Sequence, residues 1–225
     1  MALNSNRFQV AIINIIVLLF FVSTTFAASG GVGTVTHLSG PLFGKKGDGA
    51  QRVLSINSAV EQGDTLVAEK RTYGRVKFTD GGEVTLRPGT VFVVESYVFN
   101  KDKPADDKAV FSLLKGSLRA VTGQVSKRGN VNAYKMKAPT ATIGVRGTSY
   151  DMKICDGNCP GLSDGIYFYV TDGAIEVSNG AGSVEFGAGT YGYVMNDSTL
   201  PVLLPFEPSL GLDIAPLESS SCGVR

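Results

Sequence analysis

The chain has 225 residues, with 21 basic and 20 acidic side chains, and its formal net charge at pH 7 is +1. This balance excludes the strongly basic surface that most nucleic-acid-binding proteins use, so we expect no nucleic-acid partner. The length suits a single domain of ordinary size.

The N-terminus has the pattern of a secretory signal peptide. Arg7 precedes an apolar run from Val10 to Val22, which is followed by small residues around Ala27 and Ala28. The run is shorter than the roughly 20 residues that a spanning helix needs. We therefore predict a signal peptide over residues 1–27, cleaved after Ala27, with export across the inner membrane, a periplasmic location and no stable membrane span after cleavage. An uncleaved anchor is the alternative.

The rest of the chain alternates apolar and polar residues between tight turns, which is typical of short strands. Residues 32–38 open the domain, and residues 57–66 approach a second strand through a Gly63-Asp64 turn. Residues 74–87 predict a hairpin around Asp80-Gly81. No stretch shows a helical apolar period over a dozen positions. We predict an all-β fold, a strand-rich roll or sandwich of many short strands joined by tight turns, with no large helical domain.

The second half of the chain repeats this pattern. Residues 166–177 surround an Asp172-Gly173 turn in the same form as the first hairpin, and Asn179-Gly180 starts another turn. Residues 100–107 form a polar loop. From Leu200 onward prolines recur among leucines, which predicts an extended tail without ladder pairing. The expected organisation is a β-domain over residues 28–197 and a Pro-rich tail over residues 198–225.

Residues 138–151 predict a bent strand with an arginine at its bend. Ala141, Ile143 and Val145 alternate with polar or small residues, so Arg146 points away from the core. If Gly147 marks a bulge, the parity reverses and Tyr150 returns to the apolar face. The kink would change the direction of the residues around it.

Two cysteines are close together in a loop rich in turn-forming residues. In an exported protein Cys155 and Cys159 are expected to pair as a disulfide that shapes the loop. A zinc site would need two more ligands, for which only Cys222 and His37 are available. We therefore expect no metal and no cofactor. Cys222 either stays free or pairs between chains.

The order of several motifs resembles the FecR domain family. These are GTVTHLSG at 33–40, the Gly63-Asp64-Thr65-Leu66 turn, GRVKFTDGGEVTLRPGT at 74–90, LLKGSLRAVTG at 113–123 and MKAPTATIGVRGTSYDM at 136–152. The resemblance covers residues 32–152 closely and residues up to 195 loosely. The namesake is a membrane-spanning regulator that relays receptor occupancy to a cytoplasmic sigma factor, with its FecR domain in the periplasm.

The resemblance implies a compact exported β-domain that binds another envelope protein or a cell-wall or surface component, without catalysis. Only a handful of residues precede the apolar run, so we do not carry over the control of a sigma factor. The sequence leaves the partner and the oligomeric state open.

The candidate binding residues lie on two segments. Arg146, Gly147, Thr148 and Tyr150 lie in the VRGTSYD segment, and Arg119 follows a separate short run. An arginine can hold a carboxylate or a carbonyl group bidentately. The alternative is that each arginine pairs with an acid such as Glu83 or Asp151 on a neighbouring strand.

Catalytic patterns are weak. Gly161 to Gly165 fits G-x-S-x-G, but a strand-like run follows where a nucleophile elbow needs a helix. A calcium loop starting at Asp156 fails because Pro160 occupies a ligand position. An envelope hydrolase that acts on glycans through two acids, drawn from Asp80, Glu83, Asp151 and Asp156, remains the alternative function.

Overall fold

The computed structural model describes residues 30–128, 130 and 132–208. The predicted signal peptide and the last 17 residues, including Cys222, lie outside this range. The description below concerns residues 31–208, which belong to one compact unit. Within them we find only strands, turns and one 3₁₀ turn, Pro104–Asp106, which confirms the all-β prediction.

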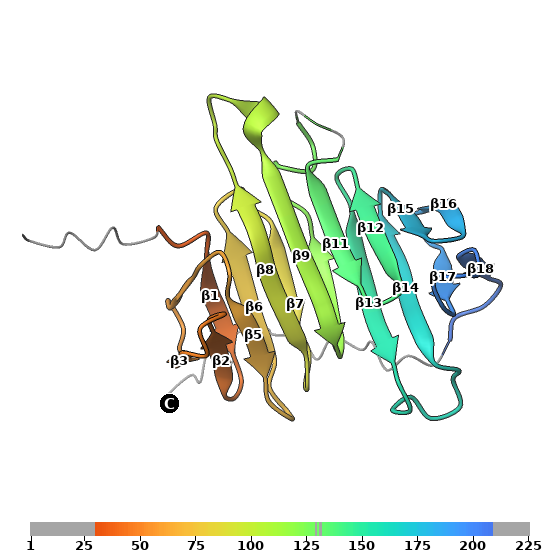
Figure 1. Ribbon diagram of the computed structural model, residues 1–225, viewed down its shortest axis with the longest axis horizontal. Helices are drawn as coiled ribbons and strands as arrows, with labels where there is room; N and C mark the ends of the chain where they lie inside the picture. The colour runs from red at the N-terminus through yellow and green to blue at the C-terminus, as the bar shows by residue number, and fades with distance from the viewer. Residues whose placement is uncertain (1–29, 129, 131, 209–225) are drawn as a thin grey trace, which may run out of the picture. The chain divides into compact units, whose positions relative to one another are not determined.

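Eighteen strands form two nine-stranded sheets, called sheet I and sheet II (Figure 1). Sheet I has the spatial order β4 (Ala59–Val60), β1 (Gly33–Leu38), β6 (Gly74–Phe78), β7 (Glu83–Leu86), β10 (Ser117–Val121), β13 (Ser149–Cys155), β14 (Gly165–Asp172), β17 (Tyr191–Val194) and β18 (Val202–Leu204). Sheet II has the order β3 (Gln51–Leu54), β2 (Leu42–Lys45), β5 (Thr65–Ala68), β8 (Val91–Val98), β9 (Lys108–Lys115), β11 (Tyr134–Ala138), β12 (Ala141–Val145), β15 (Ala174–Asn179) and β16 (Gly182–Gly187).

The chain advances along the sandwich as it is built, because both sheets run from N-terminal strands at one end to C-terminal strands at the other (Figure 1). Neighbouring strands pair antiparallel throughout the described part of the chain, except that β11 pairs parallel with β9. Parallel strands cannot be joined by a tight turn. Here the chain visits β10 of sheet I between them.

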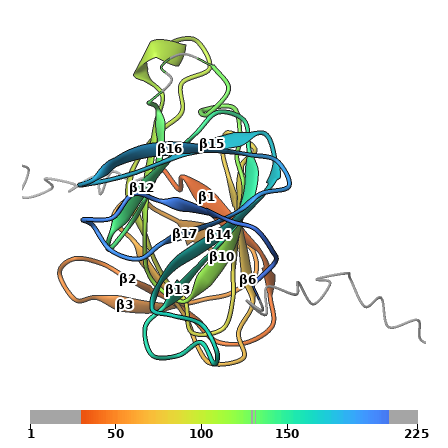
Figure 2. The same ribbon diagram turned by 90° about the vertical axis from the view of Figure 1, so that its right-hand side faces the viewer.

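The core lies between the two sheets, which Figure 2 shows from the end at which β16 and β17 lie. In β6, Val76 and Phe78 are buried while Lys77 between them is exposed, as a period of two requires. Aromatic rings join the sheets: Phe78 lies 4.9 Å from Phe111 and Phe168 lies 4.7 Å from Phe186, measured between ring centroids. Each such ring contributes roughly 1.5–3 kcal/mol by burial.

The Gly63-Asp64 turn leads into β5, as the sequence predicts, and its acid is buried. Arg52 on β3 donates to both carboxylate oxygens of Asp64, at 2.9 and 2.6 Å, and Lys46 lies 3.0 Å away. Although burial opposes the charged form, these donors lower the pKa of Asp64 below its ordinary value. The turn is thus fixed to β3 by an ionised carboxylate.

The hairpin over residues 74–87 is confirmed as β6 and β7, and β15 and β16 pair around Asn179-Gly180. Two other expectations were wrong in detail. The predicted bent strand is two strands, because β12 belongs to sheet II and β13 to sheet I. Likewise β14 belongs to sheet I and β15 to sheet II, so Asp172-Gly173 is not a hairpin turn. Both turns carry the chain from one sheet to the other.

Part of the predicted tail forms a strand. Residues 202–204 pair with β17 as the edge strand β18. The two prolines, Pro201 and Pro205, flank these three residues instead of interrupting them, so the missing amide hydrogens do not prevent pairing.

Candidate binding site

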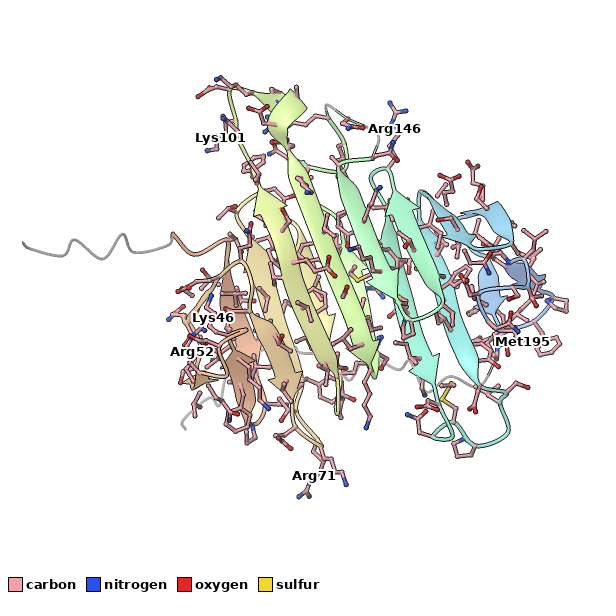
Figure 3. All side chains as sticks on the ribbon, viewed as in Figure 1. Lys46, Arg52, Arg71, Lys101, Arg146 and Met195 are labelled. Carbon is pink, nitrogen blue, oxygen red and sulfur yellow. A yellow bond between two sulfur atoms is a disulfide. The ribbon has the colours of Figure 1, made fainter. Side chains whose placement is uncertain are left out.

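Arg146 lies on the turn that joins β12 to β13, and its side chain extends into solvent at one end of the sheets (Figure 3). No hydrogen bond or ion pair connects it to the described residues. Gly147 next to it has a φ of +67°, in the left-handed region that favours glycine. The turn therefore presents a guanidinium group at the surface.

Thr148 fixes this turn to two other segments. Its amide donates to the hydroxyl of Thr122 at 2.8 Å, and that hydroxyl donates to the carbonyl of Thr148 at 3.0 Å. The hydroxyl of Thr148 donates to the carbonyl of Ala174 at 2.6 Å. A side chain at Gly173 would approach the Gly147 carbonyl to 2.7 Å, so the two crossing turns pack closely. Arg146 thus extends from a rigid base.

Tyr150 faces the core, as the reversed parity predicts. It is fully buried, and its hydroxyl lies 3.1 Å from that of Tyr134 on β11. Burial raises the pKa of Tyr150 well above its ordinary value. The ring joins the two sheets from inside, and its predicted part in binding stays a prediction that geometry does not support.

A row of charged side chains crosses the outer face of sheet I. Asp151 on β13 is buried and accepts hydrogen bonds from Arg87 at 2.5 Å and from Arg119 on β10 at 3.5 Å. The register places Arg119 directly between Thr85 and Asp151. The structural interpretation of Arg119, a pair with an acid on the next strand, therefore agrees with the geometry.

The carboxylates considered for hydrolysis are already engaged. Asp80 accepts from the backbone amides of Gly82 and Val125, at 2.9 and 3.1 Å. Glu83 lies 3.8 Å from the Lys77 ammonium and 4.0 Å from Arg75. Asp80 therefore stabilises its own hairpin and attaches it to the segment after β10.

Cys155 and Cys159 form the predicted disulfide, with their Cα atoms 5.4 Å apart. The bridge belongs to a second apolar cluster on the outer face of sheet I, together with Tyr167 and Tyr193. Both tyrosine hydroxyls donate to loop carbonyls, those of Ser163 and Asp164. This cluster was not predicted from the sequence, although the alternating tyrosines of residues 167–169 and 191–193 signal a second ordered face.

The loop that resembles a calcium site uses its polar groups internally. Asp164 accepts from the amide of Gly157 at 2.7 Å, and Asn158 accepts from that of Asp156 at 3.2 Å. Among the described residues, no three histidine, cysteine or acidic side chains lie close enough together to hold a metal ion. The same part of the chain contains no helix that is long and apolar enough to cross a membrane.

Comparisons with known proteins identify a family. A family model described as "FecR protein" matches residues 64–185, which is just over half of the chain. A comparison with curated proteins found no match. Among solved structures, two crystal structures of a candidate anti-sigma factor from Parabacteroides distasonis ATCC 8503, at 2.50 and 1.65 Å resolution, are similar at 15% identity with TM-scores of 0.47. Each match covers 62% of this chain and 58% of that protein.

Proposed function

Since this chain belongs to the FecR protein family, we propose that it acts as a non-catalytic sensing or interaction module of the cell envelope. Its partner would be another envelope protein or a cell-wall or surface component. The family match carries this proposal, and the matched residues 64–185 include both the crossing turn and the charged row. The family's regulators work through protein contacts, which supports binding as the mode of action.

The turn at residues 146–148 is the contact that we propose. Arg146 is exposed on it, whereas Gly147 and Thr148 define its backbone. Because hydrogen bonds already fix the backbone of this turn, less conformational entropy is lost when a partner binds. A guanidinium group can hold a carboxylate through two parallel hydrogen bonds, which favours a partner with an acidic group.

Export to the periplasm is part of the same proposal. The predicted signal peptide of residues 1–27 lies outside the described residues, so support comes from the sequence and from the Cys155–Cys159 bridge. Disulfides persist mainly in oxidising compartments. The N-terminal mass of mature protein tests this: an intact Met1 would contradict cleavage after Ala27.

A binding experiment with two matched arginine variants tests the function. Mature protein immobilised as bait in envelope extract should lose its specific partner when Arg146 is replaced by alanine, and regain only part of it with lysine. Arg71→Ala is the control, because Arg71 is also exposed but lies at the opposite end of the sheets (Figure 3).

Melting temperatures of all three variants show whether the fold is intact. Equal capture by Arg146→Ala and unmodified protein would contradict the proposed contact. Turnover of peptidoglycan or another glycan that is lost on replacing Glu83 or Asp151 would instead establish the hydrolase.

A further inference from the structure

A second cation, Lys127, lies against the turn that carries Arg146. Its side chain covers Gly147, because a Cβ atom added at that glycine would lie 3.3 Å from the Lys127 Cγ and 3.5 Å from its Cε. Lys127 is exposed, as Arg146 is. Neither its ammonium group nor the Arg146 guanidinium has a hydrogen bond or an ion pair with the residues that the structure describes. The turn therefore presents two cations, which come from separate parts of the chain.

The two charges are close enough to act on one bound segment. Consecutive Cα atoms are about 3.8 Å apart, so the Lys127 ammonium lies at most about 10 Å from the Cα atom of Arg146. Both side chains are long and rotatable, and each can direct its charged group toward the other. An anion between them would be attracted by both charges and would reduce their mutual repulsion.

The backbone that carries Lys127 is fixed on both sides. Before it, the amide of Val125 donates to the carboxylate of Asp80 at 3.1 Å. After it, the Arg128 side chain donates to the buried carboxylate of Asp107 at 2.9 Å. The neighbouring cation Arg128 is thus used inside the protein, whereas the charge of Lys127 is available to another molecule.

One side of the turn also offers an apolar contact. Val121, at the end of β10, is 42% exposed and lies directly beside Ser149 on β13. On the other side of Ser149 lies Asp172 of β14, an exposed acid. Lys127 follows β10 in the chain, so an acidic ligand is favoured on the β10 side and repelled on the β14 side. A peptide can supply both an acidic and an apolar side chain, whereas a phosphate-bearing polymer would leave Val121 uncovered.

We propose that Lys127 and Arg146 together bind an acidic segment of a protein partner, which presents two neighbouring carboxylates to the cations and an apolar side chain to Val121. This inference rests on the proposed function, since it uses the same turn, and it adds a second binding residue and the class of ligand. Arginine holds one carboxylate through two hydrogen bonds, and lysine acts on the other as a point charge.

Fluorescence anisotropy of mature protein with two labelled peptides tests the proposal. The acidic peptide GSLEESG should bind at least about tenfold more tightly than its neutral counterpart GSLQQSG, since both ion pairs contribute. Lys127→Gln keeps a long side chain over Gly147 but removes the charge, and it should weaken binding of the acidic peptide about three- to fivefold. Lys127→Glu should weaken it by about tenfold or more, because an attraction becomes a repulsion.

The matched controls are Lys101→Gln and Lys101→Glu. Lys101 is exposed at the same end of the sheets as Arg146, on the loop between β8 and β9 (Figure 3). At physiological ionic strength exposed charges more than about 8 Å apart are largely screened, so these variants should bind the acidic peptide as unmodified protein does. Melting temperatures verify each fold, and where Lys127→Glu is destabilised, Lys127→Gln decides.

Equal affinity for the two peptides, or equal effects of the Lys127 and Lys101 variants, would overturn the proposal. Displacement of the acidic peptide by inorganic phosphate at the same or a lower concentration would overturn it in favour of a phosphate-bearing ligand. The capture experiment separates this inference from the proposed function. Capture that is lost in Arg146→Ala but complete in both Lys127 variants rejects Lys127 alone, whereas complete capture by Arg146→Ala rejects the proposed contact itself.

Discussion

Two arginines with similar sequence surroundings have opposite environments in this fold. Arg119 lies inside β10, between Thr85 on one neighbouring strand and Asp151 on the other. Arg146 lies on a crossing turn and contacts none of the described residues through hydrogen bonds. The difference shows that the interior of a sheet supplies a partner from the next strand, whereas a turn leaves the same side chain available for another molecule.

The two environments divide a stabilising region, the charged row, from the turn that we propose for recognition. In the charged row, Arg119 and Asp151 lie on strands and the acid is buried, so an uncompensated charge there would be costly. In the turn, the hydrogen bonds of Thr148 stabilise the backbone, and Arg146 supplies the exposed charge. Three variants test whether the two roles are as separate as the contacts indicate.

The largest effect is expected at Asp151. Replacing it with alanine removes the carboxylate that accepts hydrogen bonds from both Arg87 and Arg119, and should lower the free energy of unfolding by about 3–5 kcal/mol. Urea denaturation of mature protein measures the change. Glu83→Ala is the matched control, since its pairs are partly exposed and should contribute less than about 1 kcal/mol. Similar losses for both variants would show that the row has no special role.

An intermediate effect is expected at Thr148. Valine has nearly the same shape as threonine but no hydroxyl group, so the Ala174 carbonyl loses the hydrogen bond that Thr148 donates. The free energy of unfolding should fall by about 1–3 kcal/mol. We also expect weaker partner binding, because the turn under Arg146 loses one of its fixed contacts. A stability loss without any change in binding would show that the contact does not depend on a rigid turn.

The smallest effect on stability is expected for the two arginines themselves. Arg119→Ala should lower the free energy of unfolding by roughly 0.2–1 kcal/mol, since the Arg119 side chain is partly exposed and its contact with Asp151 is long, at 3.5 Å. Arg146→Ala should change it by less than about 0.5 kcal/mol. In the capture experiment the two variants should rank the other way round: Arg146→Ala should reduce the amount of partner captured, and Arg119→Ala should leave it unchanged. Should Arg119→Ala abolish capture as well, the recognition surface would include the row.

Sequence patterns predicted the strands better than their arrangement. Alternation identified the core-facing side of β6 and the return of Tyr150 to the interior, because that signal is local. It did not distinguish a turn within one sheet from a crossing between sheets, since glycine with a positive φ serves at both Gly81 and Gly173. Only packing against the opposite sheet decides between them.

The site was predictable to a lesser degree. The exposure of Arg146 followed from parity along its own strand. The contact between Arg87 and Asp151 did not, because these residues are 64 positions apart and their meeting depends on the register of three strands. The second apolar cluster was missed for a similar reason, since its tyrosines look like ordinary strand residues until the disulfide loop covers them.

The short strand β18 has a consequence for solubility. It is the last strand of sheet I, with Leu203 60% exposed and Phe206 69% exposed nearby. Open edges with apolar side chains invite pairing between molecules, which leads to aggregation. Pro201 and Pro205 limit this edge to three residues and withhold amide donors on both sides. Pro201 and Pro205 therefore limit the pairing of strands from other molecules with this edge of sheet I.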